Sequence, residues 1–202
     1  MSQTNKVRQR LSPSERREKI LGSASEEFAS HPYASVTITS IAAASESSNA
    51  LVYRYFESKE HLYVEVLKHS FHDLEVAQDQ ALSALPPGVS VRDRLRVALG
   101  VYLGFVADAP SAWFLPYQRA AGEPAAAATF RADMRQSYVD KLSGLLKGGR
   151  TNRKHYSLWG FLGFLDAACG DWVSRGCPPD QHDTLIETSL GALEGALGDW
   201  SA

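Results

Sequence analysis

The chain has 202 residues, of which 44% are apolar and 22% charged, so it can bury one large core or two small ones. Its formal charge of -2 excludes a uniformly basic nucleic-acid-packaging protein, but the charge is unevenly placed. Residues 1–59 hold eight Lys and Arg against six Asp and Glu, whereas the remainder holds 13 against 17. Positive charge therefore gathers at the amino-terminal end, as attraction to DNA phosphates requires.

The sequence pattern predicts neither a secretory signal nor a membrane span, and it contains two cysteines. The amino terminus is polar and basic without an apolar core, and the longest apolar stretch, residues 158–173, is interrupted by Asp166 and Asp171. We therefore expect a cytoplasmic protein that does not contact a membrane. Cys169 and Cys177 are then expected to be reduced thiols, with a redox-sensing pair as the alternative.

The first 58 residues predict a basic arm followed by a domain of three helices. Ser12-Pro13-Ser14-Glu15 is a capping box with proline at the first helical position, and it starts a helix that Pro32 stops. Thr37 caps a short second helix, and a third begins after a serine-rich turn, most simply with Ser47 as its cap. Two short helices across a tight turn indicate a helix-turn-helix, whose second helix enters the DNA major groove.

Residues 59–202 predict a second, purely helical domain. A long helix of roughly 40 Å is expected first, and Pro86-Pro87-Gly88 ends it. The helical ranges that we predict are 59–85, 91–107, 111–121, 124–146, 152–174 and 179–200. The fold class is therefore all-α, with about nine helices in total.

The helix-turn-helix resembles the TetR family of bacterial transcriptional regulators. The family pattern is matched in register by Thr37, Ile41-Ala42, Ser48, Val52-Tyr53, Tyr55-Phe56, Ser58-Lys59-Glu60 and Leu62, and the helix before it by Ile20-Leu21, Ala24 and Phe28. Glu46 and Ser47 depart from the Gly-Val usual in the turn, and Ala50 stands where Gly is common. The resemblance implies a homodimeric DNA-binding regulator, more often a repressor, with a small-molecule pocket in its carboxy-terminal domain.

Nine residues are candidate DNA contacts: Thr37, Ser47, Ser48, Asn49, Ala50, Tyr53, Arg54, Tyr55 and Lys59. Asn49 is suited to adenine and Arg54 to guanine, although Arg54 contacting only a phosphate is an equal alternative. By the resemblance, Tyr53 and Lys59 match positions that contact the DNA backbone, and Lys59 also sits at a helix start that favours anions. Capping alone remains open for Thr37, and core packing is favoured for Tyr55.

The carboxy-terminal domain is rich in aromatic residues, most of which are expected in the core. The resemblance implies an effector pocket between helices matching residues 59–85, 91–107, 124–146 and 152–174. The candidate lining residues are Tyr102, Phe105, Trp113, Tyr117, Met134, Tyr138 and Trp159. Arg131 and Arg135 suit an acidic ligand, but two charges four residues apart on a helix favour a solvated face.

The last two helices carry the predicted dimer interface. An apolar stripe runs along the final helix at Ile186, Leu190, Leu193 and Leu197, and a smooth track of small residues runs along the preceding one at Gly163, Ala167 and Gly170. Two such helices from each chain are expected to form a four-helix bundle about a two-fold axis, which places two heads on a palindromic operator. The alternative is that these helices only close the domain's own core.

Other functions receive less support from the sequence. His69, His72 and Asp73 are spaced for a divalent ion but lack a third distant ligand, so we expect no metal, and no cofactor or catalytic motif is apparent. A rival function keeps the DNA binding but drops the effector: an architectural or cell-division factor that recruits a protein partner. A second rival is an enzyme with a vestigial DNA-binding head.

Overall fold

The computed structural model describes residues 11–108, 123–146 and 151–198, and this part of the chain is all-α, as predicted. Its eight α-helices and one 3-10 helix are α1 (Pro13–Ser30), α2 (Ile38–Ala44), α3 (Asn49–Tyr55), α4 (Lys59–Ser83), α5 (Val91–Asp108), α7 (Ala125–Leu145), α8 (Asn152–Ser174), η1 (Pro179–Gln181) and α9 (His182–Leu197). The helix predicted at 111–121 lies outside the described residues, as does most of the basic arm.

Side-chain caps start the helices of the amino-terminal part. The Ser12 hydroxyl accepts from the Glu15 amide at 3.2 Å, and the Glu15 carboxylate accepts from the Ser12 amide at 2.7 Å, which completes the predicted capping box. Thr37 caps α2, and Ser58 caps α4. The cap of α3 is Ser48, so the prediction of Ser47 is wrong. Ser47 belongs to the preceding turn instead, because its amide donates to Ala42 and its hydroxyl donates to the Ser45 carbonyl.

Two hydrophobic cores divide the molecule. The first, which we call the head core, joins α1, α2, α3 and the start of α4, and Ala127 of α7 reaches into it. The second, the body core, joins the rest of α4 with α5, α7, α8 and α9. Leu67 belongs to the head core and Leu74 to the body core, so the two cores meet within α4. A single helix therefore belongs to both.

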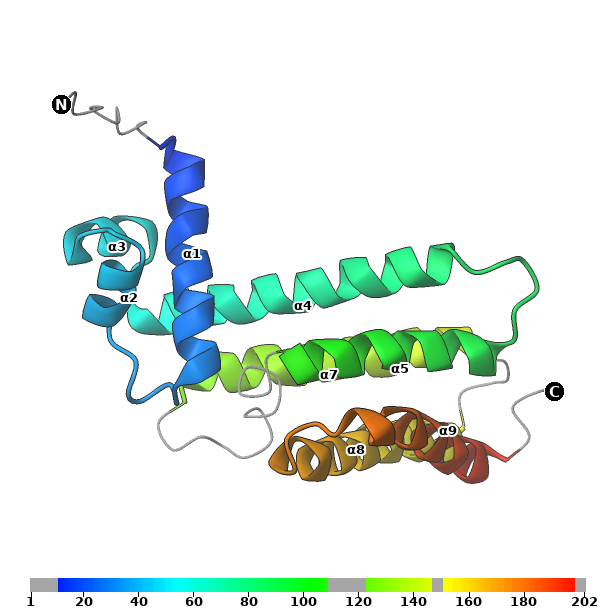
Figure 1. Ribbon diagram of the computed structural model, residues 1–202. Helices are drawn as coiled ribbons and strands as arrows, with labels where there is room; N and C mark the ends of the chain where they lie inside the picture. Colours follow the sequence, from blue (N-terminus) through cyan, green and yellow to red (C-terminus); the bar gives the residue numbers. More distant parts are fainter. Residues whose placement is uncertain (1–10, 109–122, 147–150, 199–202) are drawn as a thin grey trace.

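The long helix α4 connects the part of the molecule that holds the head core to the part that holds the body core. Its 25 residues make a rod of roughly 37 Å. Figure 1 shows α1 standing across the first part of α4, with α2 and α3 beside it, while α5 and α7 lie along the remainder. Both cores are therefore built on one continuous helix.

The helices α8 and α9 pack against each other beneath α5 (Figure 1). Ile186, Leu190 and Leu193 of α9 are buried in the body core, and Leu197 packs against it. Gly170 of α8 is buried as well. Within one chain, α5 and α8 already cover these side chains, and the dimer interface predicted on α8 and α9 stays a prediction.

Candidate DNA interface and effector cavity

The recognition helix α3 presents a polar face to solvent. Ser48, Asn49, Ala50 and Arg54 are exposed, and the Tyr53 side chain is 53% exposed despite its size. Asn49 donates from Nδ2 to the Thr39 hydroxyl at 3.0 Å, which orients its amide from the side of α2. Val52 and Phe56 are fully buried and fix the helix on the head core. The candidate base-reading residues thus share one exposed face on a firmly packed helix.

Three further candidate contacts have structural roles of their own. Thr37 is exposed, but its hydroxyl accepts from the Ser40 amide at 3.0 Å as the cap of α2. Tyr55 is half-buried and packs against the head core, which agrees with the packing role favoured for it. Ser47 is likewise half-buried in the turn.

The turn between α2 and α3 contains the left-handed residue Glu46, with φ of 51°. L-residues rarely adopt this region, which explains physically why a glycine suits the position. The Glu46 carboxylate accepts from Lys19 of α1 at 3.0 Å. An acidic group beside the recognition helix is thereby partly neutralised by a cation of the same domain.

The ammonium of Lys59 is engaged at the base of the head. It donates to the Tyr33 carbonyl and lies 4.1 Å from the centre of the Tyr33 ring. Burial lowers the pKa of Lys59. This geometry ties the α1–α2 connection to the start of α4, and the phosphate contact expected of Lys59 stays a prediction.

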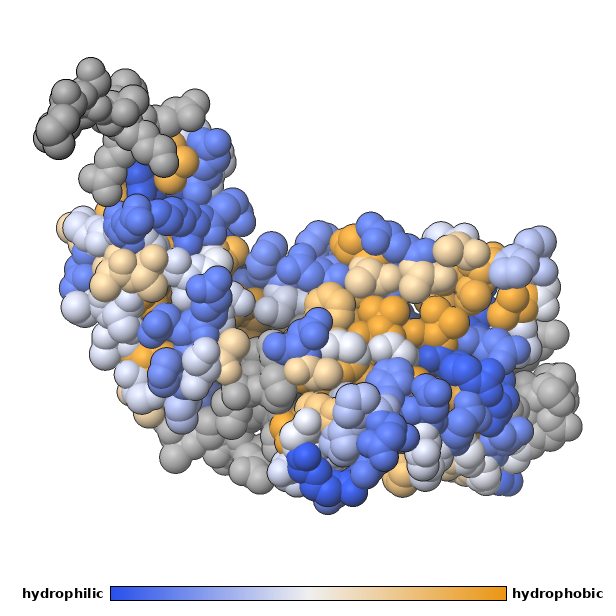
Figure 2. Space-filling model, in the orientation of Figure 1, coloured by the Kyte–Doolittle hydropathy of each residue, from blue (hydrophilic) through white to orange (hydrophobic). Residues whose placement is uncertain are grey.

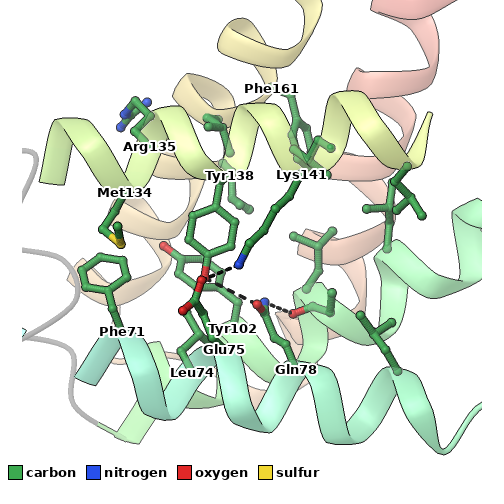
Figure 3. A pocket seen from close by; sticks show the side chains of 18 of the residues that line it. Phe71, Leu74, Glu75, Gln78, Tyr102, Met134, Arg135, Tyr138, Lys141 and Phe161 are labelled. Carbon is green, nitrogen blue, oxygen red and sulfur yellow. Dashed lines mark hydrogen bonds and ion pairs between the residues drawn. The ribbon is translucent and has the colours of Figure 1, made fainter. Parts of the chain in front are cut away.

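The body encloses a cavity of about 250 Å³ between α4, α5, α7 and α8. Figure 3 shows Phe71 and Met134 facing each other at one end, with Tyr138, Gln78 and Lys141 further along. Figure 2 shows apolar residues gathered along the line where α4 meets α5 on this face of the molecule. The volume lies just below the ~300–1,000 Å³ typical of small-molecule sites.

Ion pairs satisfy two of the cations that line this cavity. Arg135 donates to Asp166 at 2.5 Å, and Lys141 donates to Glu75 (Figure 3). Burial raises the pKa of Asp166 to about 7 despite the nearby Arg135 guanidinium. Burial also raises the pKa of the Tyr138 hydroxyl, which stays neutral and lies 3.5 Å from the Gln78 amide oxygen.

A second polar cluster closes the end of the cavity nearest the head. Arg131 donates from Nη2 to Glu123 at 2.5 Å and to the Tyr63 hydroxyl at 2.9 Å. The Tyr63 hydroxyl in turn donates to Glu123 at 3.0 Å, and burial raises the pKa of Tyr63 to about 12. Arg131 and Arg135 do not form the solvated face favoured by their spacing, because both guanidinium groups are paired and largely buried.

The candidate effector residues have mixed outcomes in the structure. Tyr102, Met134 and Tyr138 line the cavity, whereas Phe105 and Trp159 do not and pack against the body core instead. Trp113 and Tyr117 lie outside the described residues. Sequence reasoning missed the polar lining from α4, Glu75, Gln78 and Asp79, since exposed and cavity-facing polar residues look alike in a helical pattern.

Neither metal binding nor thiol chemistry gains support in the described part of the chain. No group of three metal-ligating side chains occurs there, and His69 is paired with Asp73 at 3.5 Å. Cys169 is buried and hydrogen-bonded to the Tyr102 hydroxyl, and burial raises the pKa of its thiol to about 12, which disfavours the thiolate form at neutral pH. None of the described helices is long and apolar enough to span a membrane.

Small residues remain exposed on α8 and α9. Gly163 and Ala167 lie on the outer face of α8 near Phe164, which is 36% exposed, and Gly191 and Gly195 lie on the outer face of α9. A side chain added at any of the three glycines would meet nothing within 4 Å. Packing inside one chain therefore does not require these glycines.

Comparisons with known proteins agree with this geometry. Residues 20–66 match the family described as bacterial regulatory proteins, tetR family. A TetR-like regulator from Rhodococcus sp. RHA1 is 22% identical, with a TM-score of 0.71 over 94% of this chain and 100% of that one. A tetR-family regulator from Streptomyces coelicolor is 21% identical, with a TM-score of 0.74 over 94% of this chain and 91% of that one.

A third similar structure contains a ligand. FadR from Bacillus subtilis, solved in complex with stearoyl-CoA, is 17% identical, with a TM-score of 0.66 over 90% of this chain and 97% of that one. These structural likenesses show the fold, and the family match covers the predicted helix-turn-helix. Residues 20–66 thus match the tetR family of bacterial regulatory proteins, and the described part of the chain has the fold of TetR-like transcriptional regulators.

Proposed function

We propose that this regulator is a homodimeric repressor that a small apolar molecule releases from a palindromic operator. The observation that carries the proposal is the position of the cavity, because α4 both lines it and forms part of the head core. A molecule entering the cavity pushes on the same rod that holds the recognition helix. We take residues 1–58 as the DNA-binding domain and 59–202 as the effector and dimerisation domain.

The release mechanism follows from the geometry of two recognition helices. A dimer binds both half-sites only when its recognition helices lie about one helical turn apart, ~34–36 Å. An effector that fits the cavity better when α4 is displaced shifts the population toward the state with the wrong spacing. Its effect on DNA affinity equals the difference between its affinities for the two states.

The chemistry of the cavity favours an apolar effector of modest size. Most lining side chains are apolar, including Phe71, Leu99, Met134 and Phe161, and the space is about 250 Å³. The Bacillus subtilis FadR structure holds stearoyl-CoA, which is also largely apolar along its acyl chain. A whole acyl-CoA exceeds a drug-sized ligand, so we infer a smaller molecule for this chain.

The dimer interface that we propose is the exposed outer face of α8 and α9. Each glycine costs ~1 kcal/mol relative to alanine in a helix, and no contact among the described residues offsets this at Gly163, Gly191 or Gly195. Close approach of a second copy offsets it instead. Gly163 and Ala167 keep the interface role predicted for them, while Ile186, Leu190 and Leu193 support it from beneath.

Sedimentation of arginine variants tests this interface. Gly163→Arg combined with Gly195→Arg adds two charges where the single chain has room, so the fold survives and the dimer dissociates. Gly144→Arg is the matched control, since that exposed glycine of α7 also has open space around it. A double variant that remains dimeric would place the interface elsewhere.

The operator is tested by selecting binding sites from a random DNA pool. The proposal expects an inverted repeat, which the dimer binds with both recognition helices. Fluorescence anisotropy on the selected site then measures release by compounds that raise the melting temperature. We expect such a compound to lower DNA affinity at least about fivefold. A compound that binds the cavity and leaves DNA affinity unchanged would favour the ligand-independent alternative.

A further inference from the structure

Among the described residues, Arg131 lines the cavity and has two donor nitrogens without a hydrogen-bond partner. Its side chain is only 10% exposed, and it lines the cavity from α7. Nη2 makes both hydrogen bonds of the guanidinium, to Glu123 and to Tyr63, whereas Nε and Nη1 are buried and have no partner in the described part of the chain. Buried donors without a partner are rare in folded proteins, and each calls for an explanation.

The other cavity cations, Arg135 and Lys141, have no nitrogen among the buried donors without a partner in the described part of the chain. Arg135 is bonded to Asp166 and Lys141 to Glu75, so each ammonium or guanidinium faces a carboxylate across the cavity wall. Arg131 also has a carboxylate, Glu123, which balances its charge but occupies only one of its three nitrogens. What Arg131 lacks is therefore an acceptor atom and not a counter-charge.

We propose that Arg131 is the effector-sensing residue, which binds an uncharged carbonyl oxygen of a small apolar molecule and passes this binding to the head through Tyr63. An uncharged acceptor fits better than a carboxylate, because a second anion would be repelled by Glu123 at the same guanidinium. The apolar part of the molecule then lies along Phe71 and Met134, toward Tyr138. This inference rests on the proposed function of the cavity as an effector site.

The path to the head consists of direct contacts. The Tyr63 hydroxyl accepts from Arg131, and its ring packs 4.8 Å from the Phe28 ring and 4.9 Å from the Tyr33 ring, measured between centroids. Tyr33 in turn holds the Lys59 ammonium through its carbonyl and its ring. A carbonyl that draws the guanidinium into the cavity changes the Nη2 contact with Tyr63, and thereby the seating of α4 against α1.

Three probes of nearly the same size and shape test recognition: acetophenone, isopropylbenzene and benzoate. They present a carbonyl, no acceptor and a carboxylate on the same ring, and ligand-observed NMR measures their dissociation constants. Acetophenone is expected to bind about tenfold more tightly than either of the others, the gain from one satisfied buried donor. Equal binding of acetophenone and isopropylbenzene would overturn the role of Arg131 and leave the cavity intact.

Other outcomes are equally decisive. Tightest binding by benzoate would refute the uncharged acceptor. Binding of no probe to the cavity would refute the effector site itself, and with it the proposed function. The pair Arg131→Met with Glu123→Gln removes both charges together, so no buried carboxylate is left unpaired, and the preference for acetophenone should disappear. Arg94→Met is the matched control, because Arg94 also has a buried Nε without a partner but does not line the cavity.

Tyr63→Phe tests the transmission step. It removes the hydroxyl but keeps the ring, so acetophenone should bind as before while its effect on DNA affinity, measured by anisotropy on the selected operator, falls toward a ratio of one. Tyr33→Phe removes a hydroxyl from the same aromatic cluster without contact to Arg131 and should retain the full ratio. If Tyr63→Phe responds to acetophenone as fully as the wild type, the path runs elsewhere.

Discussion

Replacing Glu46 by glycine tests whether the turn before the recognition helix is strained. Glu46 has φ of 51°, and the left-handed region costs an L-residue about 1–2 kcal/mol, a cost that glycine avoids. Glycine also lowers the free energy of unfolding by about 0.4–1 kcal/mol, because it increases the conformational freedom of the unfolded chain. Glu46→Gly should therefore be about 0.5–1 kcal/mol more stable than Glu46→Ala, which loses the same carboxylate and keeps the strained backbone.

Both variants also lose the ion pair with Lys19, which is worth about 0–1 kcal/mol at a site where Glu46 is 65% exposed. Comparing the two variants cancels this loss. Thermal unfolding followed by circular dichroism should place the glycine variant about 1–4 °C above the alanine variant. Equal melting temperatures, or a more stable alanine variant, would refute the argument that this residue is strained.

Two further predictions concern the recognition helix and the cavity. Arg54→Ala should relax sequence preference at one position per half-site, which selection from a random DNA pool measures. Tyr53→Ala should weaken binding to all sequences alike, which fluorescence anisotropy measures. The pKa of Asp166 in the folded protein, about 7, exceeds its value in the unfolded chain, so folding favours the protonated carboxyl. The stabilisation that results is complete below about pH 4 and is lost as the pH rises to about 7. Relative to Asp166→Asn, the wild type should lose about 1–3 kcal/mol of unfolding free energy between pH 5 and pH 8 in urea titrations, and a constant difference would contradict this.

The helical framework could be predicted from local signals. The starts of α1, α2 and α4 follow from the sequence, because each is preceded by a hydroxyl residue suited to capping: Ser12, Thr37 and Ser58. The start of α3 did not, because four adjacent polar residues offer several caps. The left-handed Glu46 selects Ser48 among them, and backbone dihedral angles cannot be inferred from composition.

Features that depend on packing between helices were harder to predict. The apolar residues Ile186, Leu190 and Leu193 have the helical periodicity of any buried face. Periodicity does not show whether the same chain or a second copy buries them, because that depends on the position of α5. Arg131 shows the same limit for polar residues. Its spacing from Arg135 fits a solvated face, and only the approach of Tyr63 and Glu123 from distant parts of the chain reveals its buried state.

The sharing of α4 between two cores limits how this protein can be divided. A fragment ending at residue 58 would lack Leu62, Tyr63 and Val66, which complete the core beneath the recognition helix. A chimera that gives this head a different sensor body must therefore exchange the chain between Leu67 and Leu74, within the helix. Ala127 and Phe130 of the body would still need counterparts in the new sensor, since both pack against the head core. A chimera with a new sensor should therefore be joined in the middle of α4. A junction in the connecting turn at residues 56–58 would divide the head core.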